Sequence, residues 1–196
     1  MRKILLICGL MAVMAMESFA QPGVGIGFRL GDLNGISVKS NFGDNAVEVS
    51  VGRLLRFSNH SYETWFYNKK IYTEGYYAYR YAKIGIPLSL QAHYLKHRTI
   101  DFADPLRWYY GIGGQVRMYP VEYTYWYYPD PNLAYKEAGV AKRKSWEAGV
   151  DWVLGLEYNF PEVPIGLYMD AQLYMEVYDS PFFSWGLFGI GARYNF

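Results

Sequence analysis

Charged side chains recur at alternate positions along most of the chain, and basic residues come before acidic ones. The set consists of Arg29, Lys39, Lys83, Arg107 and Arg117, then Glu147, Asp151, Glu157, Asp170 and Glu176, with Glu48 and Arg193 out of that order. Carboxylate pairs such as Asp151 and Asp170 are residue types used in acid–base catalysis. Enclosed charges of opposite sign instead pair with each other, because an isolated buried charge is costly. We therefore predict an ion-pair network formed by these twelve residues.

A nucleophilic group is the second chemistry to consider. His60 is surrounded by the residue types of a Ser-His-acid triad, namely Ser58, Ser61 and Glu63. Neighbours on one loop do not make a triad, which is recognised by its geometry. We expect His93 near the end of a strand and His97 in a turn, both in contact with solvent. The glycine clusters around Gly25 and Gly113 lack the full G-x-G-x-x-G spacing of phosphate loops. The sequence thus predicts no catalytic, cofactor-binding or metal-binding residue.

Aromatic residues concentrate in two polar segments, 57–78 and 120–144, which we predict to be loops. Tyrosine and tryptophan give large contact areas with a polar group, which suits binding surfaces. The binding candidates are Trp65, Tyr67, Tyr125, Trp126 and Tyr127, with the basic run Lys142, Arg143 and Lys144. The basic run can meet phosphate groups. Alternatively, these aromatic residues pack against one another or form an interfacial girdle.

The first twenty residues have the parts of a secretory signal peptide. Arg2 and Lys3 precede an apolar run over 4–16, and Ser18-Phe19-Ala20 supplies small residues before a cleavage site after Ala20. The run is shorter than the ~20 apolar residues of a spanning helix. The only cysteine, Cys8, lies within this run. We therefore expect a signal peptide over 1–20 and a secreted domain over 21–196 without disulfides or thiol chemistry.

The secreted part has a hydrophobic period of two, which is typical of β-strands. In residues 165–177 one face reads Ile165, Leu167, Met169, Ala171, Leu173 and Met175, and the other reads Gly166, Tyr168, Asp170, Gln172, Tyr174 and Glu176. The same alternation predicts eight strands, with a bulge at Pro87 because proline lacks the ladder donor. Large aromatic residues on the apolar faces and glycines opposite favour a lipid-facing wall over a soluble barrel or sandwich. We predict an all-β fold, an eight-stranded antiparallel up-and-down transmembrane β-barrel following a cleaved signal peptide.

The last predicted strand ends Gly189-Ile190-Gly191-Ala192-Arg193-Tyr194-Asn195-Phe196. It resembles the final strand of small bacterial outer-membrane β-barrel proteins, the OmpA/OmpX-like family, as do the stretches 25–28 and 110–113. The resemblance implies the outer membrane of a Gram-negative bacterium, surrounded by lipid and lipopolysaccharide. It also implies that Tyr194 and Phe196 form the signal read by the barrel-assembly machinery.

Charge excludes one class of partner, since 19 Lys+Arg against 18 Asp+Glu give no basic field for nucleic acid. The favoured function is a structural or surface-interaction barrel without enzyme activity, in which ion pairs fill the lumen and the aromatic loops bind an unidentified extracellular partner or surface glycan. A narrow outer-membrane pore is the alternative. A lipid A-modifying enzyme, which would use His60, is the third hypothesis.

Overall fold

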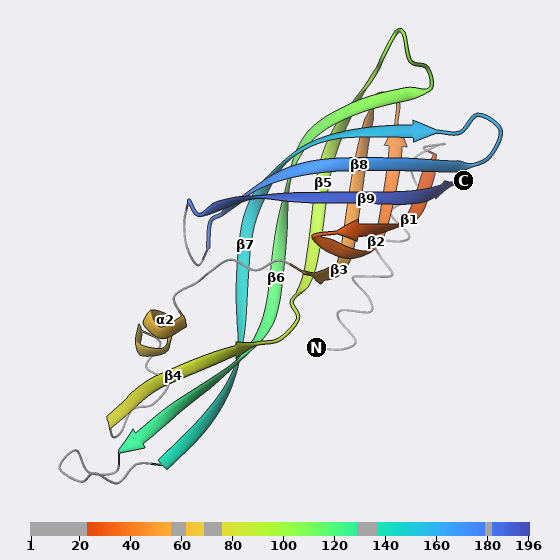
Figure 1. Cartoon of the computed structure of the whole chain (residues 1–196). Coiled ribbons are helices and arrows are strands. Elements are labelled where there is room, and N and C mark those ends of the chain that lie inside the picture. The colour runs from red at the N-terminus through yellow and green to blue at the C-terminus, as the bar shows by residue number, and fades with distance from the viewer. Residues whose placement is uncertain (1–22, 56–61, 69–75, 129–136, 179–181) are drawn as a thin grey trace.

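The computed structural model describes residues 23–55, 62–68, 76–128, 137–178 and 182–196, almost all in strands (Figure 1). The elements are β1 (Val24–Gly31), β2 (Leu33–Phe42), β3 (Asn45–Leu54), α2 (Tyr62–Asn68), β4 (Tyr76–Ile84), β5 (Leu88–Thr99), β6 (Leu106–Tyr128), β7 (Glu137–Asn159), β8 (Ile165–Glu176) and β9 (Ser184–Asn195). No helix in these ranges is long and apolar enough to cross a membrane. The expected signal peptide lies outside the described residues. So do three of the four residues considered above for a Ser-His-acid triad, namely Ser58, His60 and Ser61.

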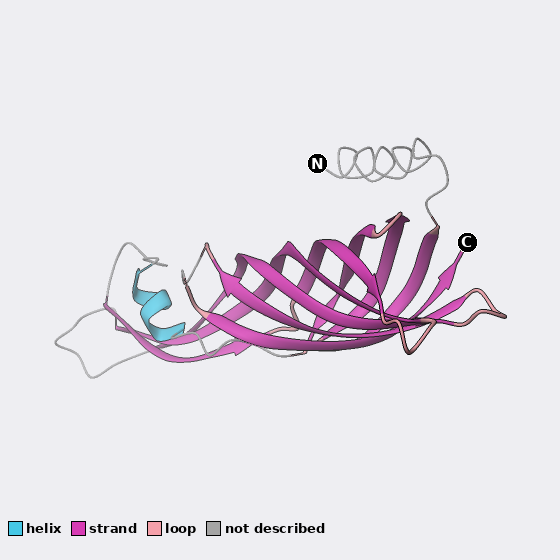
Figure 2. Cartoon of the chain, turned by 90° about the horizontal axis from the view of Figure 1, so that it is seen from above, coloured by secondary structure: helices cyan, strands magenta, loops and turns pink. Residues whose placement is uncertain are grey.

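Eight strands close into one antiparallel ring, which confirms the predicted fold class. Going round the ring, the order is β1, β2, β3, β5, β6, β7, β8 and β9, and β9 pairs back with β1. The closing pair is regular from Gly25 opposite Asn195 to Gly31 opposite Gly189. Figure 2 shows the ring from a direction at right angles to Figure 1. Closure leaves these eight strands without an unpaired edge over the ring itself.

Burial alternates along most of the ring strands, and the side with most of the polar residues is the buried one. In β8 the outward residues Leu167 and Met169 are exposed, whereas Tyr168 and Asp170 between them are buried. The outward residues of β1 follow the same rule, with Phe28 70% exposed beside a buried Arg29. The ring therefore encloses a polar lumen within an apolar wall, which is the reverse of a soluble protein.

β4 is a ninth strand outside the ring. It pairs with the outer part of β6, whose partner on the other side is the first part of β7. We call this three-stranded sheet, which projects beyond the ring with α2 beside it in Figure 1, the outer extension. The prediction of a loop over 120–144 was therefore wrong, because β6 continues to Tyr128 and β7 begins at Glu137. Tyrosine, tryptophan, valine and threonine, which dominate this part of β6, are good strand formers.

The break between β4 and β5 confirms the bulge expected at Pro87. Leu88 pairs with Met118 but Ile84 pairs with Val121, so the β4–β5 side has one extra residue. A one-residue shift exchanges the two faces of a strand. Lys83 therefore points outward, opposite Glu122, and is exposed. Its predicted place in the lumen was wrong for this reason.

Tyrosines in the lumen lie against glycines of the neighbouring strand. Tyr109 is opposite Gly155, and Tyr168 is opposite Gly191. A Cβ added at Gly155 would overlap the Tyr109 ring and come within 2.7 Å of the Met169 carbonyl oxygen. Because the interior of an eight-stranded barrel is filled by side chains, a large ring can enter only where its neighbour has none.

We expect Gly155→Ala to destabilise the barrel by about 1–3 kcal/mol through overpacking. Urea unfolding in phospholipid vesicles would measure the change. The matched control is Gly186→Ala in β9, where an added Cβ meets only a Phe188 ring atom at 4.0 Å. Equal stability of the two variants would contradict the tight fit.

Candidate functional site

The tightest ion pair in the lumen joins β1 to β8. Arg29 donates from both terminal nitrogens to Asp170, at 2.5 and 2.6 Å. The same carboxylate accepts hydrogen bonds from the Tyr109 hydroxyl at 3.3 Å and the Gln172 amide at 3.2 Å. Asp170 therefore has donors around both oxygens, as a buried carboxylate requires.

A second cluster lies between β2, β3, β7 and β9. Arg193 reaches Glu48 at 2.8 Å and Glu157 at 3.1 Å, and Glu157 also pairs with Lys39. His97 Nε2 lies 2.8 Å from the Lys39 ammonium and 3.1 Å from Glu157. Each charge in this cluster faces an opposite charge, which is the condition for tolerating buried ions.

Glutamines connect this region with the outer half of the lumen. Gln91 donates to Gln115 at 2.9 Å and approaches Gln172 at 3.4 Å, and Gln115 donates to Asp151 at 3.1 Å. His93 Nε2 lies 3.2 Å from the other oxygen of Asp151. This chain of amides leads from Asp170 to Asp151, and Asp151 has polar contacts at both oxygens.

Arg117 closes the outer end of the lumen. Its guanidinium lies 3.9 Å from the centre of the Tyr174 ring and 4.4 Å from that of Trp185, both cation–π contacts. Glu147 is 3.5 Å away and accepts a hydrogen bond from the Tyr119 hydroxyl at 2.8 Å. The carboxylate of Glu176 is fully buried at this end of β8.

Two predicted members of the network lie elsewhere. Lys83 is on the outward face of β4, as described above. Arg107 is at the rim, because it is the second residue of β6, and its partly exposed side chain lies 3.5 Å from Asp44 in the β2–β3 turn. The expectation of solvated histidines was also wrong, since β5 runs to Thr99 and both His93 and His97 point into the lumen.

Several lumen residues were missed because only formal charges were selected. They are Ser37, Gln91, His93, His97, Tyr109, Gln115, Tyr119 and Gln172. The signal was present, since they occupy the same alternating inward positions as the charges. Counting every polar inward residue would have found them.

The lumen offers packing and hydrogen bonding, and its carboxylates are occupied by protein donors. In the described ranges no group of three or more His, Cys, Asp and Glu residues is arranged to hold a metal ion. Asp151 and Asp170 each contact side chains from two other strands and are not paired with each other. This arrangement is suited to holding strands together.

The inner face of the outer extension is an aromatic cluster covered by α2. Phe66 of α2 lies 5.6 Å from the Tyr123 ring and 5.8 Å from the rings of Tyr79 and Tyr125, centre to centre. The Tyr67 hydroxyl accepts a hydrogen bond from the backbone amide of Tyr79 at 3.0 Å. Burial raises the pKa of the Tyr79 phenol above its ordinary value, and the negative charge of Glu63 acts in the same direction.

The predicted binding residues divide between the two faces of this sheet. Tyr125 and Tyr127 belong to the aromatic cluster, while Trp126 is on the outer face, where the Arg80 guanidinium lies 5.1 Å from its ring centre. Lys142 and Lys144 are exposed on that outer face, opposite Glu122 and Pro120. Arg143 is exposed on the other face, opposite Val121. Trp65 lies in α2.

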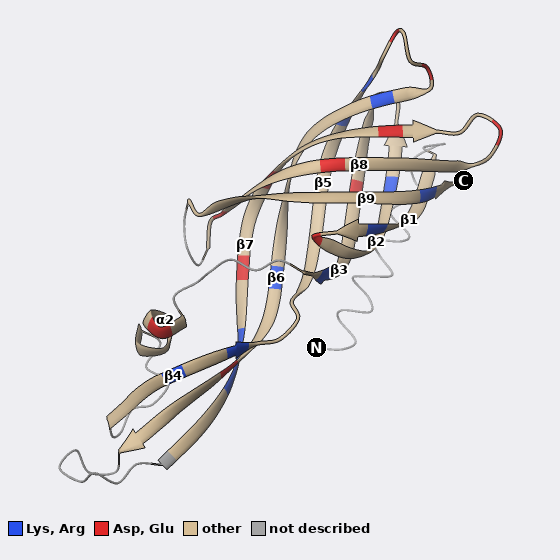
Figure 3. Ribbon diagram, in the orientation of Figure 1, with Lys and Arg blue, Asp and Glu red and all other residues tan. Residues whose placement is uncertain are grey.

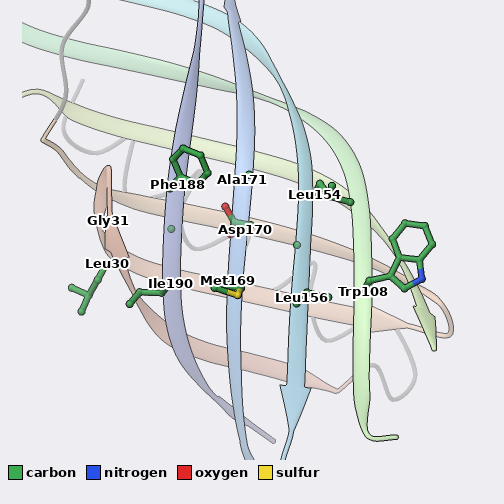
Figure 4. A pocket seen from close by; sticks show the side chains of 12 residues that line it. Leu30, Gly31, Trp108, Leu154, Leu156, Met169, Asp170, Ala171, Phe188 and Ile190 are labelled. Carbon is green, nitrogen blue, oxygen red and sulfur yellow. The ribbon is translucent and has the colours of Figure 1, made fainter. Parts of the chain in front are cut away.

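A shallow groove of about 700 Å³ crosses the outside of the wall from β1 to β6 (Figure 4). Its lining is apolar, with Leu30, Ile190, Met169, Leu156 and Trp108 in one row. The carboxylate of Asp170 belongs to the lumen side, where it binds Arg29. The groove therefore provides apolar contact and no reactive group.

Comparison with known proteins gives similarities of low identity. Ail, the attachment invasion locus protein of Yersinia pestis, is 12% identical over 89% of this chain and 94% of its own, with a TM-score of 0.41. Neisserial surface protein A (NspA) is 11% identical with the same coverages and a TM-score of 0.43. No family model and no curated protein matches the chain. At these scores the likeness carries no functional conclusion.

We expect Arg29→Ala to cost about 3–5 kcal/mol, because it leaves the Asp170 charge buried without its cation. Replacing both partners, as Arg29→Met with Asp170→Leu, should recover most of that loss. The control is Arg107→Gln at the exposed rim, which should unfold like the unmodified protein. Urea unfolding in vesicles measures all three, and a tolerated Arg29→Ala would argue against a tightly coupled lumen.

Proposed function

We propose that this chain spans the outer membrane of a Gram-negative bacterium and serves there as a structural or surface-interaction barrel. The observation that carries the proposal is the inverted distribution of side chains over the ring. Phe28, Leu154, Met169 and Ile190 face outward and are more than half exposed, while Arg29, Lys39, Glu157 and Asp170 face inward and are buried. Hydrocarbon outside the ring would remove the cost of this exposed apolar surface.

The ends of the ring give the orientation. β1 begins and β9 ends at the rim that also carries the short turns at 43–44, 100–105 and 160–164. The outer extension and α2 are at the opposite rim, as is the one-residue connection between β1 and β2 at Asp32. Bacterial barrels have short periplasmic turns and longer external segments. We therefore assign the outer extension to the cell surface.

The filled lumen supports a structural role over transport. Side chains of strands that are not neighbours meet in it: Lys39 of β2 meets Glu157 of β7 on the opposite wall, and Arg29 of β1 meets Asp170 of β8, two strands away. At the outer end Arg117 lies against two aromatic rings. Such a lumen holds the wall rigid and carries the outer extension, which provides the surface for interactions.

Export and assembly complete the proposal. A signal peptide over 1–20, cleaved after Ala20, would deliver the chain to the periplasm. Tyr194 and Phe196 are exposed at the end of β9 with ring centres 4.9 Å apart. This exposed pair suits recognition by the barrel-assembly machinery before insertion.

We predict different costs for the same substitution at two positions of β7. Leu154 and Val140 point outward and are similarly exposed, at 58% and 57%, but only Leu154 lies in the ring. Leu154→Arg should cost about 2–4 kcal/mol near the bilayer midplane, and Val140→Arg about 0–1 kcal/mol beyond it. Urea unfolding in vesicles gives both values. Similar small costs at both positions would mean that water surrounds the whole strand and would refute membrane insertion.

Orientation can be tested with single cysteines, since Cys8 is the only native one and lies in the expected signal peptide. Ala138→Cys in the outer extension should react with a membrane-impermeant maleimide on intact cells. Asp101→Cys in the opposite turn, which is also exposed, should react only after the outer membrane is permeabilised. The reverse pattern of labelling would invert the orientation.

A further inference from the structure

The outward face of the outer extension is continuous with the outward, apolar face of the ring. The last apolar row of the ring at this rim is Leu88 of β5, Met118 of β6 and Trp146 of β7, in which Leu88 and Trp146 are about half exposed. The next row brings Lys144 beside Pro120, and the row after that is Lys83, Glu122 and Lys142. The chemistry thus changes from apolar to basic within four residues, or about 13 Å along a strand.

The bulge before β5 is what brings these lysines together. Without the extra residue, Lys83 would lie on the face of the lumen residues. With it, Lys83 and Lys142 lie on either side of Glu122, and Figure 3 shows basic residues gathered where β4 and β7 leave the ring. All three lysines are exposed, so their side chains can reach a ligand outside the protein.

A groove of about 260 Å³ lies between the two strands that carry Lys83 and Lys142. Gly85, Pro120, Val121 and Glu122 also line it. Gly85 is needed there, because its amide donates to the Pro120 carbonyl at 2.8 Å and an added Cβ would meet the proline ring at 2.5 Å. The groove is therefore a built feature of the bulge.

Charge in the groove favours an anion. Lys83 and Lys142 line it with one carboxylate, that of Glu122, which lies 3.3 Å from Lys142, and Lys144 is in the next row. Ammonium groups bind phosphate as point charges, and long lysine side chains extend toward the polar layer from an apolar surface. The phosphates nearest to the end of an apolar wall are those of the surrounding lipid.

We propose that Lys83, Lys142 and Lys144 form a binding site for a phosphorylated lipid headgroup of the outer leaflet, held beside the outer extension. This inference rests on the proposed function, because it requires the wall below to be in the membrane. The lipid's acyl chains would lie against the row that contains Trp146, and its phosphate would contact the ammonium groups of the three lysines outside the protein surface.

The test measures binding of lipid A to the purified full chain in detergent micelles by native mass spectrometry. The probes are lipid A with its phosphates and the same lipid A after dephosphorylation. In the triple variant Lys83→Gln, Lys142→Gln and Lys144→Gln, the apparent Kd for the phosphorylated form should rise about fivefold for each lysine removed. Binding of the dephosphorylated form should not change. Heat-modifiable gel mobility would show that each variant is folded.

Two further variants make the result specific. Glu122→Gln removes the competing carboxylate and should tighten binding of phosphorylated lipid A. Arg98→Gln removes an exposed outward cation at the opposite rim and should leave binding unchanged. An unchanged Kd in the triple variant, or an equal loss in Arg98→Gln, would overturn the proposed site.

Inorganic phosphate distinguishes the two sources of the anion. Its ability to displace phosphorylated lipid A is compared with its ability to displace the same phosphorylated headgroup without acyl chains. If the same phosphate concentration displaces both, the site binds soluble anions and the lipid assignment fails. Suppose that lipid binding fails, but Leu154→Arg is costly and Val140→Arg is tolerated. That result would refute this site alone. Failure of both tests would remove the proposed function as well.

Discussion

A closed ring of eight strands has an interior only as wide as the side chains that point into it, and this constraint governs the rest of the structure. Each inward residue must fit against those of the opposite wall, and each inward charge must find its partner inside the ring. Lys39 finds Glu157 on the opposite wall, and Arg29 finds Asp170 two strands away in the ring. The glycines opposite Tyr109 and Tyr168 meet the steric requirement.

Alternation along the sequence was sufficient to predict the ring, because the same period of two determines both the strand and the face of each residue. It also identified most inward charges. It could not show which charges meet, since pairing across the ring depends on the stagger between strands. Arg29 and Asp170 are 141 residues apart and belong to strands that are not neighbours in the ring.

The errors of prediction have local causes. A bulge moved Lys83 to the opposite face, which cannot be read from alternation alone even when the bulge itself is expected. In the segment 120–144 the aromatic and basic residues form no clear apolar face, so the sequence pattern predicts a loop there. There the aromatic side chains themselves form the buried face, under α2. Polar tyrosine-rich strands therefore resemble binding loops until a packing partner is known.

The ring and the outer extension differ in which side chains they bury and which they expose. Within the ring, buried polar contacts fix the distance between walls, and the outside presents apolar side chains. In the outer extension, aromatic rings pack beneath α2, while the other face presents Arg80, Lys83 and Lys142. The long strands β6 and β7 join these regions without a flexible connection.

The strand edges of the outer extension affect how neighbouring copies of the chain can associate. Within the described residues, β4 pairs only with β6, so its other edge is unpaired. The strand pairing of β7 with β8 ends at Gly149, and the Ala148 carbonyl accepts two more hydrogen bonds, from the amides of Val177 and Tyr178. Two such edges would invite neighbouring molecules to join into a continuous sheet. The extra residue Arg80 interrupts one edge, and Lys142, Arg143 and Lys144 place like charges along the other. Many copies can thus stand close together at high density and remain separate molecules.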